Sequence, residues 1–139
     1  VQQACELHKN IKGDPLAIFA ALGGLELAAI AGAILAARLA KVPVVLDGFA
    51  CTVAAAILYA IKPYTIDHCL VSHCSVEPGH KKLLGKINKE SLLDLGMRLG
   101  EGSGATLALG IIRAAIACHL GMATFEGAGV SNSQSNKIV

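Results

Sequence analysis

The sequence predicts an α/β protein in which Ala-rich helices cover an open, mostly parallel sheet. The first observation is a recurring unit, in which a short apolar run ends in a small or polar loop that feeds a helix. The three loops are Asp47-Gly48, Ser72–Ser75 and Gly100–Gly104. The second observation is composition, since 54% of the 139 residues are apolar although only 4% are aromatic, and 15 are glycine. An apolar content made largely of small residues is typical of closely packed helices.

The N-terminal part of the chain is expected to be helical. Asp14 followed by Pro15 is a favourable helix start, because Asp accepts hydrogen bonds from free N–H groups and Pro is tolerated in the first turn. The pair Gly23-Gly24 separates two helices, and Pro43 lies just beyond the second. The expected helices are the end of one within Val1–Asn10, then Pro15–Leu22 and Leu25–Ala40.

Three short strands are expected to alternate with three more helices. Val44–Leu46 is an apolar, β-branched run between Pro43 and Asp47-Gly48, which is typical of a buried parallel strand. The other candidate strands are Asp67–Val71 and Leu95–Leu99. The expected helices are Phe49–Ile61, one opened by Glu77-Pro78-Gly79-His80, and Ala105–Leu120.

Charge and hydropathy exclude several classes of protein. Lys and Arg number 12 and Asp and Glu number 10, and a net charge of +2 is too weak for binding nucleic acid through its phosphates. A mean hydropathy of +0.59 raises the question of a membrane protein. Glu26 lies within the apolar stretch Leu16–Ala40 and Arg113 within Gly104–Leu120, where charges are costly in lipid. We expect no membrane span and expect these helices to be buried in a larger soluble core; a membrane-associated helical protein is the alternative.

The five cysteines favour a reducing, cytoplasmic setting. They are odd in number, lack a Cys-x-x-Cys pair and lie mostly in apolar runs. The chain begins with Val1 and a polar segment, so it looks cut from a longer protein and shows no signal peptide. His68, Cys69, His73 and Cys74 are metal-ligand types, but neighbours along a strand point to opposite faces, so we expect no metal site.

The loops that follow the strands are the expected binding site. Ligands of open α/β sheets lie beyond the carboxyl ends of the strands, where helix N-termini suit an anion such as phosphate. Glu101 lies between two glycines and could accept a proton from a substrate. It could equally be an ordinary acid ahead of a helix capped by Ser103, and spacing alone favours that reading.

The other two loops leave similar alternatives open. Ser75 could cap the following helix, which the spacing favours, or it could also contact a ligand oxygen. Asp47 could form a turn or orient a ligand hydroxyl, and the turn is the simpler reading. Gly48 could serve the turn and also allow close approach of the backbone to a ligand.

Five segments in order resemble the nicotinate-nucleotide–dimethylbenzimidazole phosphoribosyltransferase family. They are Leu22–Glu26, Pro43–Phe49, Ser72–His80, Met97–Ala105 and Met122–Glu126. The resemblance covers only the C-terminal part of the family. It therefore implies an open, mostly parallel, Rossmann-like sheet that is incomplete in this chain, with residues 1–126 as the C-terminal part of a phosphoribosyltransferase domain and residues 127–139 as a flexible tail.

The resemblance also implies a reaction. Phosphoribose would pass from nicotinate mononucleotide to 5,6-dimethylbenzimidazole, giving α-ribazole 5′-phosphate and nicotinate in the synthesis of the lower ligand of cobalamin. The general base of the family falls on Glu101, a buried or half-buried carboxylate in this reading, and its nucleotide contacts fall on Gly48, Ser75, Leu99 and Gly100.

The resemblance also implies a homodimer and a transfer that needs no metal or other cofactor. The partners are the two small-molecule substrates, with no nucleic acid. Because the N-terminal part of the family is missing, we expect this chain alone to be poorly active or inactive. The alternative is a non-catalytic fragment that still binds a nucleotide or a partner chain.

Overall fold

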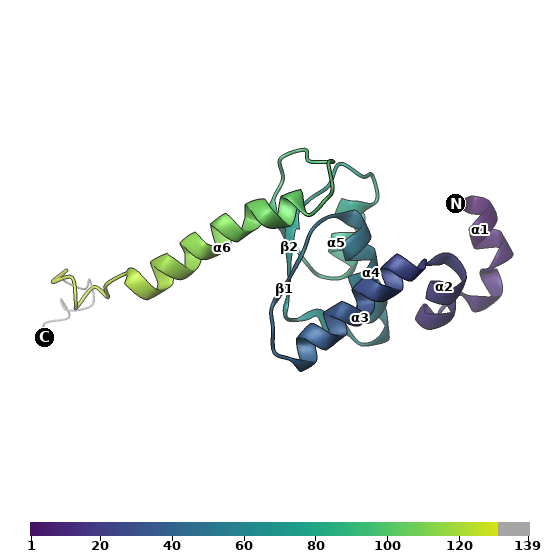
Figure 1. Cartoon of the computed structure of the whole chain (residues 1–139), viewed down its shortest axis with the longest axis horizontal. Helices are drawn as coiled ribbons and strands as arrows, with labels where there is room; N and C mark the ends of the chain where they lie inside the picture. The colour runs from purple at the N-terminus through teal and green to yellow at the C-terminus, as the bar shows by residue number, and fades with distance from the viewer. Residues whose placement is uncertain (131–139) are drawn as a thin grey trace, which may run out of the picture. The chain divides into compact units, whose positions relative to one another are not determined.

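The computed structural model describes residues 1–130 of the chain. Val1–Ala108 form one compact unit and Leu109–Val139 a second, which is described as far as residue 130. The first unit contains three parallel strands in the spatial order β1-β2-β3, with helices packed on them (Figure 1). The open, parallel α/β fold expected from the sequence is confirmed.

The strands are short and run in the same direction. They are β1, Val44–Leu46; β2, Cys69–His73; and β3, Ser91–Leu93. Val44 lies opposite Cys69, and Val71 lies opposite Ser91. Parallel strands have their carboxyl ends at the same edge of the sheet. The loops that follow β1 and β2 therefore lie next to each other at that edge.

The helices follow the local signals of the sequence. They are α1, Gln2–Leu7; α2, Pro15–Leu22; α3, Leu25–Leu39; α4, Phe49–Ile61; α5, His80–Lys86; and α6, Ser103–Gly121, with short 3-10 helices η1, Lys9–Ile11, and η2, Pro63–Ile66. Asp14 caps α2 as predicted, since its Oδ1 accepts a 3.0 Å hydrogen bond from the Ala17 N–H. The predicted bounds of α4 and of β1 are confirmed.

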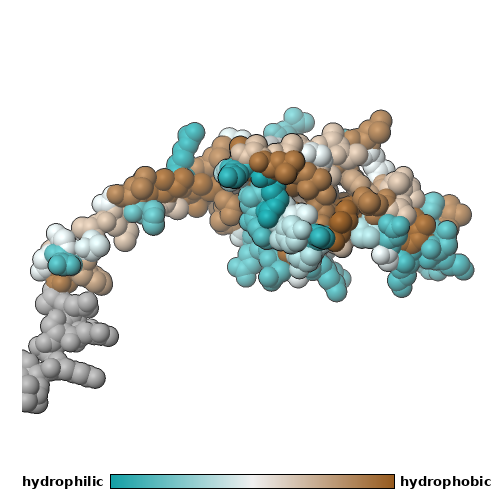
Figure 2. Space-filling view, turned by 90° about the horizontal axis from the view of Figure 1, so that it is seen from below, coloured by the Kyte–Doolittle hydropathy of each residue, from teal (hydrophilic) through white to brown (hydrophobic). Residues whose placement is uncertain are grey.

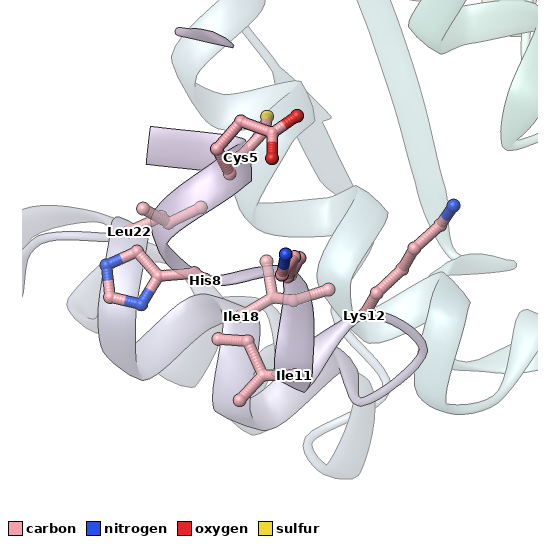
Figure 3. A pocket seen from close by; sticks show the side chains of 8 residues that line it. Cys5, His8, Ile11, Lys12, Ile18 and Leu22 are labelled. Atoms are coloured by element: carbon pink, nitrogen blue, oxygen red, sulfur yellow. The ribbon is translucent and has the colours of Figure 1, made fainter. Parts of the chain in front are cut away.

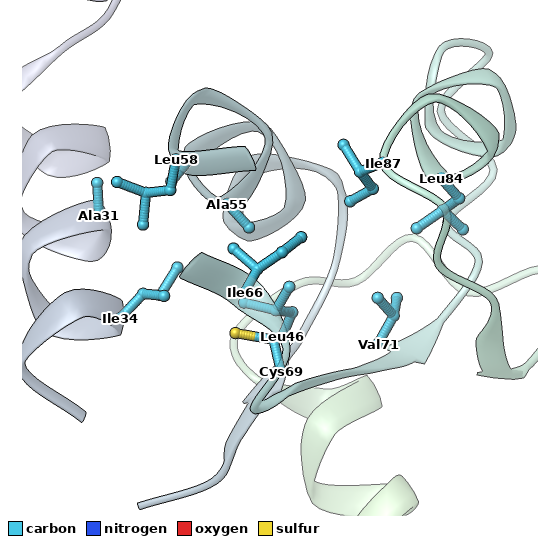
Figure 4. Packing of buried hydrophobic residues seen from close by; sticks show 11 residues of the cluster. Ala31, Ile34, Leu46, Ala55, Leu58, Ile66, Cys69, Val71, Leu84 and Ile87 are labelled. Atoms are coloured by element: carbon cyan, nitrogen blue, oxygen red, sulfur yellow. The ribbon is translucent and has the colours of Figure 1, made fainter. Parts of the chain in front are cut away.

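The hydrophobic core lies in the first unit, between the strands and the helices α3, α4 and α5 (Figure 4). Its buried apolar side chains come from β1, β2, η2, the three helices and the residue after α5. The buried members include Ile34, Leu46, Leu58, Ile66, Val71, Leu84 and Ile87. Helix α4 contacts α2, α3 and α5, so it is the element around which the unit is built.

Two predicted strands differ from those in the structure. The second strand was expected at Asp67–Val71, but it begins and ends two residues later, because Asp67 has helical backbone angles at the end of η2. Near the end of β2, Ser72 Oγ donates to the Asp47 carbonyl over 2.6 Å and holds the chain beside β1. The third strand was expected at Leu95–Leu99, and that prediction is wrong. Gly96 has a φ of +64°, which interrupts any extended run there, and β3 lies upstream.

Helix α6 is the most exposed of the long helices. The helix has a mean hydropathy of 1.5 over 18 residues, of which 11% are buried, so length and composition alone would allow it to cross a membrane. Large apolar side chains along it are exposed (Figure 2), among them Leu109, Ile111, Ile116 and Leu120. Within residues 1–130 this helix stays mostly exposed, and its burial in a larger core stays a prediction.

The segment that follows α6 forms turns as far as residue 130. The Ala128 N–H donates to the Thr124 carbonyl over 2.9 Å, and the Val130 N–H donates to the Phe125 carbonyl over 2.8 Å. Of the tail predicted at residues 127–139, residues 131–139 lie outside the described residues.

Candidate active site

A cavity of about 510 Å³ opens in the first unit where the strands end. Its lining comes from three loops and the start of α4: Asp47–Cys51, His73, Ser75, Glu77, Arg98 and Gly100–Gly102. Four of the five substrate-site residues predicted from the sequence meet here, namely Gly48, Ser75, Gly100 and Glu101. The fifth, Leu99, is 77% exposed and lies outside this lining.

The turn before α6 has an unusual backbone. Gly100, Glu101 and Gly102 have φ values of +80°, +60° and +73°, so three residues in a row lie in the left-handed region. Glycine adopts this region freely, whereas a residue with a Cβ pays about 1–2 kcal/mol. Strained backbone of this kind is enriched at functional sites. The turn presents Glu101 at the cavity, but its side chain is exposed rather than buried or half-buried as expected.

Asp47 connects the end of β1 to the start of α6. Its Oδ1 accepts a 2.9 Å hydrogen bond from the Ala105 N–H in the first turn of α6. The helix begins at Ser103 itself, so the expected cap at Ser103 is wrong, and the Ser103 hydroxyl is buried without a partner among residues 1–130. Asp47 does the capping from a distant part of the sequence, a role that neither reading of Asp47 included.

His73, the last residue of β2, lies at the centre of this arrangement. It is 2% exposed, and its Nε2 lies 3.9 Å from Asp47 Oδ1. A Cβ added to Gly48 would lie 3.3 Å from His73 Nε2, and one added to Gly104 would collide with the His73 ring. The two glycines therefore allow the loop after β1 and the start of α6 to close on this side chain. The sequence marked His73 only as a weak metal ligand.

His80, the first residue of α5, is a second buried histidine at the site. The Ser75 N–H donates to its Nδ1 over 2.9 Å, and its Nε2 lies 3.0 Å from Thr52 Oγ1 of α4. Burial, and to a lesser extent the neighbouring His73, lowers the pKa of His80. Ser75 Oγ accepts a 3.3 Å bond from the Glu77 N–H, so Ser75 closes a local turn and does not cap α5 as expected.

Comparison with known proteins shows the family to which the chain belongs. The sequence model of the family described as Phosphoribosyltransferase matches residues 1–130. The chain belongs to this phosphoribosyltransferase family.

Relatives within the family carry a more specific name. Proteins of Brucella canis and Brucella anthropi, both named nicotinate-nucleotide–dimethylbenzimidazole phosphoribosyltransferase, are 61% and 60% identical over 134 residues, 96% of this chain and 40% of each relative. A Thermus thermophilus crystal structure of the same name has a TM-score of 0.78 and 48% identity, covering 86% of this chain and 36% of that one. The chain thus spans about two fifths of the length of the curated relatives it matches.

The start of α4 contributes backbone N–H groups to the candidate cavity. Gly48 is the N-cap residue, no side chain within residues 1–130 caps this helix, and Phe49, Ala50 and Cys51 line the cavity. First-turn N–H groups have no partner within the helix, and the helix dipole adds partial positive charge. Arg98 brings a full positive charge to the same lining. These groups suit a phosphate.

Carboxylates balance that positive charge. Asp47, Glu77 and Glu101 all line the cavity. Asp47 is occupied by its bond to α6, whereas for Glu101 no hydrogen bond or ion pair is found within residues 1–130. An exposed carboxylate without a bonding partner, beside a helix start that suits a phosphate, can accept a proton from a bound substrate.

The residues of metal-ligand type serve other purposes. His68 Nε2 lies 3.0 Å from the Ile34 carbonyl oxygen, and Cys69 is buried in the core, where burial raises the pKa of its thiol. Residues 1–130 contain no group of three or more His, Cys, Asp or Glu side chains placed to hold a metal.

A second hollow, of about 480 Å³, lies among α1, η1 and α2 (Figure 3). Apolar side chains such as Ile11, Ile18 and Leu22 form much of its wall. None of the site residues predicted from the sequence lines it.

Proposed function

We propose that this chain carries the active site of a nicotinate-nucleotide–dimethylbenzimidazole phosphoribosyltransferase, a pentosyltransferase of cobalamin biosynthesis. The ribose 5-phosphate group of nicotinate mononucleotide passes to 5,6-dimethylbenzimidazole, giving α-ribazole 5′-phosphate and nicotinate. Relatives in Brucella and Thermus carry the name of this activity. The observation that supports it most is that Gly48, Ser75, Gly100 and Glu101 surround one cavity at the ends of parallel strands.

Glu101 is the proposed general base. Its carboxylate takes the N–H proton of dimethylbenzimidazole while the other ring nitrogen attacks the anomeric carbon of the ribose. The bond between that carbon and the pyridinium nitrogen breaks, and its electron pair leaves with nicotinate. The positive charge of the pyridinium is thereby neutralised, so atoms and charge balance without a metal or other cofactor.

Gly48, Ser75, Leu99 and Gly100 are the proposed nucleotide contacts. The N–H groups at the start of α4 and the Arg98 side chain supply the positive potential that a 5′-phosphate requires. The lack of a Cβ at Gly48 leaves room for the ligand beside the His73 ring. Leu99, which is exposed, would contact the nucleotide only from the rim.

A charge-removing substitution tests the base. The assay uses a full-length chain in which these residues are joined to the part of the Brucella canis relative that they do not match. We expect Glu101→Gln to lower the rate of α-ribazole phosphate formation roughly 10²- to 10⁴-fold. Glu90→Gln, at an exposed residue outside this cavity, is the matched control and should leave the rate unchanged. Equal rates for both variants would remove Glu101 from the role.

A non-catalytic role is the second candidate, because the chain spans only about two fifths of its relatives. Calorimetry of the 139-residue chain with nicotinate mononucleotide separates the two. Binding without turnover, in a chain that turns over once joined to the rest, supports the enzyme. Binding without turnover in both supports the nucleotide-binding fragment.

We also propose that the protein is a cytoplasmic homodimer that acts on small molecules and binds no nucleic acid. The five cysteines, Cys5, Cys51, Cys69, Cys74 and Cys118, are all free, which agrees with a reducing compartment. Light scattering of the full-length chain gives the mass of the particle, and a monomeric mass at assay concentration would contradict the dimer.

A further inference from the structure

One chain of hydrogen bonds joins two of the loops that line the candidate cavity. The Ser75 N–H donates to His80 Nδ1 over 2.9 Å, and His80 Nε2 lies 3.0 Å from Thr52 Oγ1. The Thr52 hydroxyl then donates to the Gly48 carbonyl over 2.9 Å. The loop after β2 is thus linked through α5 and α4 to the loop after β1.

The direction of every bond in this chain follows from one fact. A peptide N–H can only donate, so His80 Nδ1 carries no proton and accepts the bond from Ser75. A neutral imidazole then has its proton on Nε2, which donates to Thr52 Oγ1. Thr52 accepts that bond and passes its own hydroxyl proton to the Gly48 carbonyl.

The surroundings of His80 leave it no substitute partners. It is 0% exposed, so water cannot take over either ring nitrogen. Phe49 packs against the ring with a centroid distance of 5.6 Å, and His73 stands edge-on at 6.5 Å. A buried polar group that loses its partner is costly, so each of these bonds is strongly favoured in the folded chain.

We propose that His80, as the neutral Nε2–H form, is the positioning residue that holds the Gly48 and Ser75 loops at the spacing that the nucleotide requires. Its role in joining the loops stands on the hydrogen bonds alone. Its effect on substrate affinity rests on the proposed function.

Protonation of His80 would undo this arrangement. A second ring proton would sit on Nδ1, facing the Ser75 N–H, and two donors cannot bond. The titratable group that contacts the ring is His73 from β2, with Asp47 beyond it, while Glu77 and Lys81 are its nearest titratable neighbours in sequence. The pKa of His80 is lowered by burial first and by His73 second, which favours the neutral ring.

The state of the ring can be measured directly by nitrogen NMR of the 139-residue chain. At neutral pH we expect His80 Nδ1 to show the nitrogen chemical shift of an unprotonated ring nitrogen and Nε2 the chemical shift of a protonated one. We also expect a coupling across the hydrogen bond from the Ser75 N–H. A proton on Nδ1 at neutral pH would overturn the proposal, whatever the activity of the protein.

Two substitutions separate the two ends of the chain of bonds. In His80→Asn the amide oxygen takes the place of Nδ1 and can still accept from Ser75. In His80→Gln the amide nitrogen takes the place of Nε2 and can still donate to Thr52. His119→Asn, at an exposed histidine of α6, is the matched control.

Amide hydrogen exchange reports each end. We expect exchange at Ser75 to rise at least about tenfold in His80→Gln and to stay within about threefold of the unsubstituted chain in His80→Asn. The control should change neither. Equal exchange at Ser75 in the two His80 variants would contradict the proposal, and if either variant fails to fold, the ring measurement on the unsubstituted chain still decides it.

Kinetics of the full-length chain joined to the Brucella canis segment test the link to substrate. We expect His80→Gln to raise KM for nicotinate mononucleotide roughly three- to tenfold while kcat changes less. An unchanged KM in both His80 variants would overturn the link. Absence of turnover in the unsubstituted chain, with the expected ring state, would instead reject the proposed function and leave the joining role intact.

Discussion

Replacing Gly104 with alanine tests how closely α6 is packed on His73. A Cβ at this position would collide with the ring, and His73 is only 2% exposed, so the ring has little room to move. Overpacking of this kind typically costs about 1–3 kcal/mol of folding stability. The gain in helix propensity from Gly to Ala, up to about 1 kcal/mol, offsets part of that cost.

Gly32 provides the matched control for helix propensity. It lies within α3 in the same unit, and a Cβ added there meets nothing within 4 Å. Gly32→Ala should therefore stabilise the chain by up to about 1 kcal/mol. The difference in the free energy of unfolding between the two variants isolates the collision, which we expect to be about 1–3 kcal/mol.

Urea unfolding of the 139-residue chain, followed by circular dichroism, gives both values. A second pair, with and without Gly104→Ala in a His73→Ala background, should show a smaller cost because the ring is gone. Two results would refute a close contact between α6 and His73. One is a Gly104→Ala chain as stable as the Gly32→Ala chain. The other is an equal loss of stability from Gly104→Ala with and without the His73 ring.

Two further predictions concern titration and reactivity. The pKa of His80 in the folded chain lies below its usual 6.5, so the unfolded chain binds more protons just below that pH, and stability should fall as the pH drops from 6.5 toward the folded value. Thermal unfolding at several pH values checks this, and His80→Asn should flatten the fall; an equal fall in both chains would assign it to another group. Cys69 is 1% exposed with a raised thiol pKa, so iodoacetamide at mildly alkaline pH should label exposed Cys5 and Cys118 well before Cys69, and all three alike in denaturant. Native labelling of Cys69 at the rate of Cys5 would contradict its burial.

Local signals of the sequence predicted much of the fold. Asp14-Pro15 marked the start of α2, Gly23-Gly24 separated α2 from α3, and the run Phe49–Ile61 gave α4 with its observed bounds. Each signal acts on backbone geometry within a few residues. The strands were harder, because pairing depends on contacts distant in sequence. Leu95–Leu99 and Ser91–Leu93 are both short runs rich in leucine, and only the second has a partner in β2.

The residues of the candidate site also differ in whether local sequence signals could predict them. Glu101 and Gly48 stood out because glycine-bearing loops are visible in the sequence, although the strand expected before Glu101 was wrong, and the resemblance assigned them roles. His73 and His80 were missed as parts of the site because their positions depend on long-range contacts. His80 bonds to Thr52, which lies 28 residues away, and nothing in the spacing marks that pair. A buried histidine looks the same as an exposed one until the fold is known.

Hydrogen bonds to the loop Asp47-Gly48 hold the other two loops of the candidate site in place. The Asp47 carboxylate holds the start of α6, which follows directly on Glu101, and the Gly48 carbonyl holds Thr52 and through it His80 and Ser75. The proposed base Glu101 and the proposed nucleotide contact Ser75 are therefore attached to the same two residues by separate sets of hydrogen bonds. It follows that a substitution at Asp47 should displace Glu101 without displacing Ser75, whereas loss of the His80 bonds should displace Ser75 without displacing Glu101.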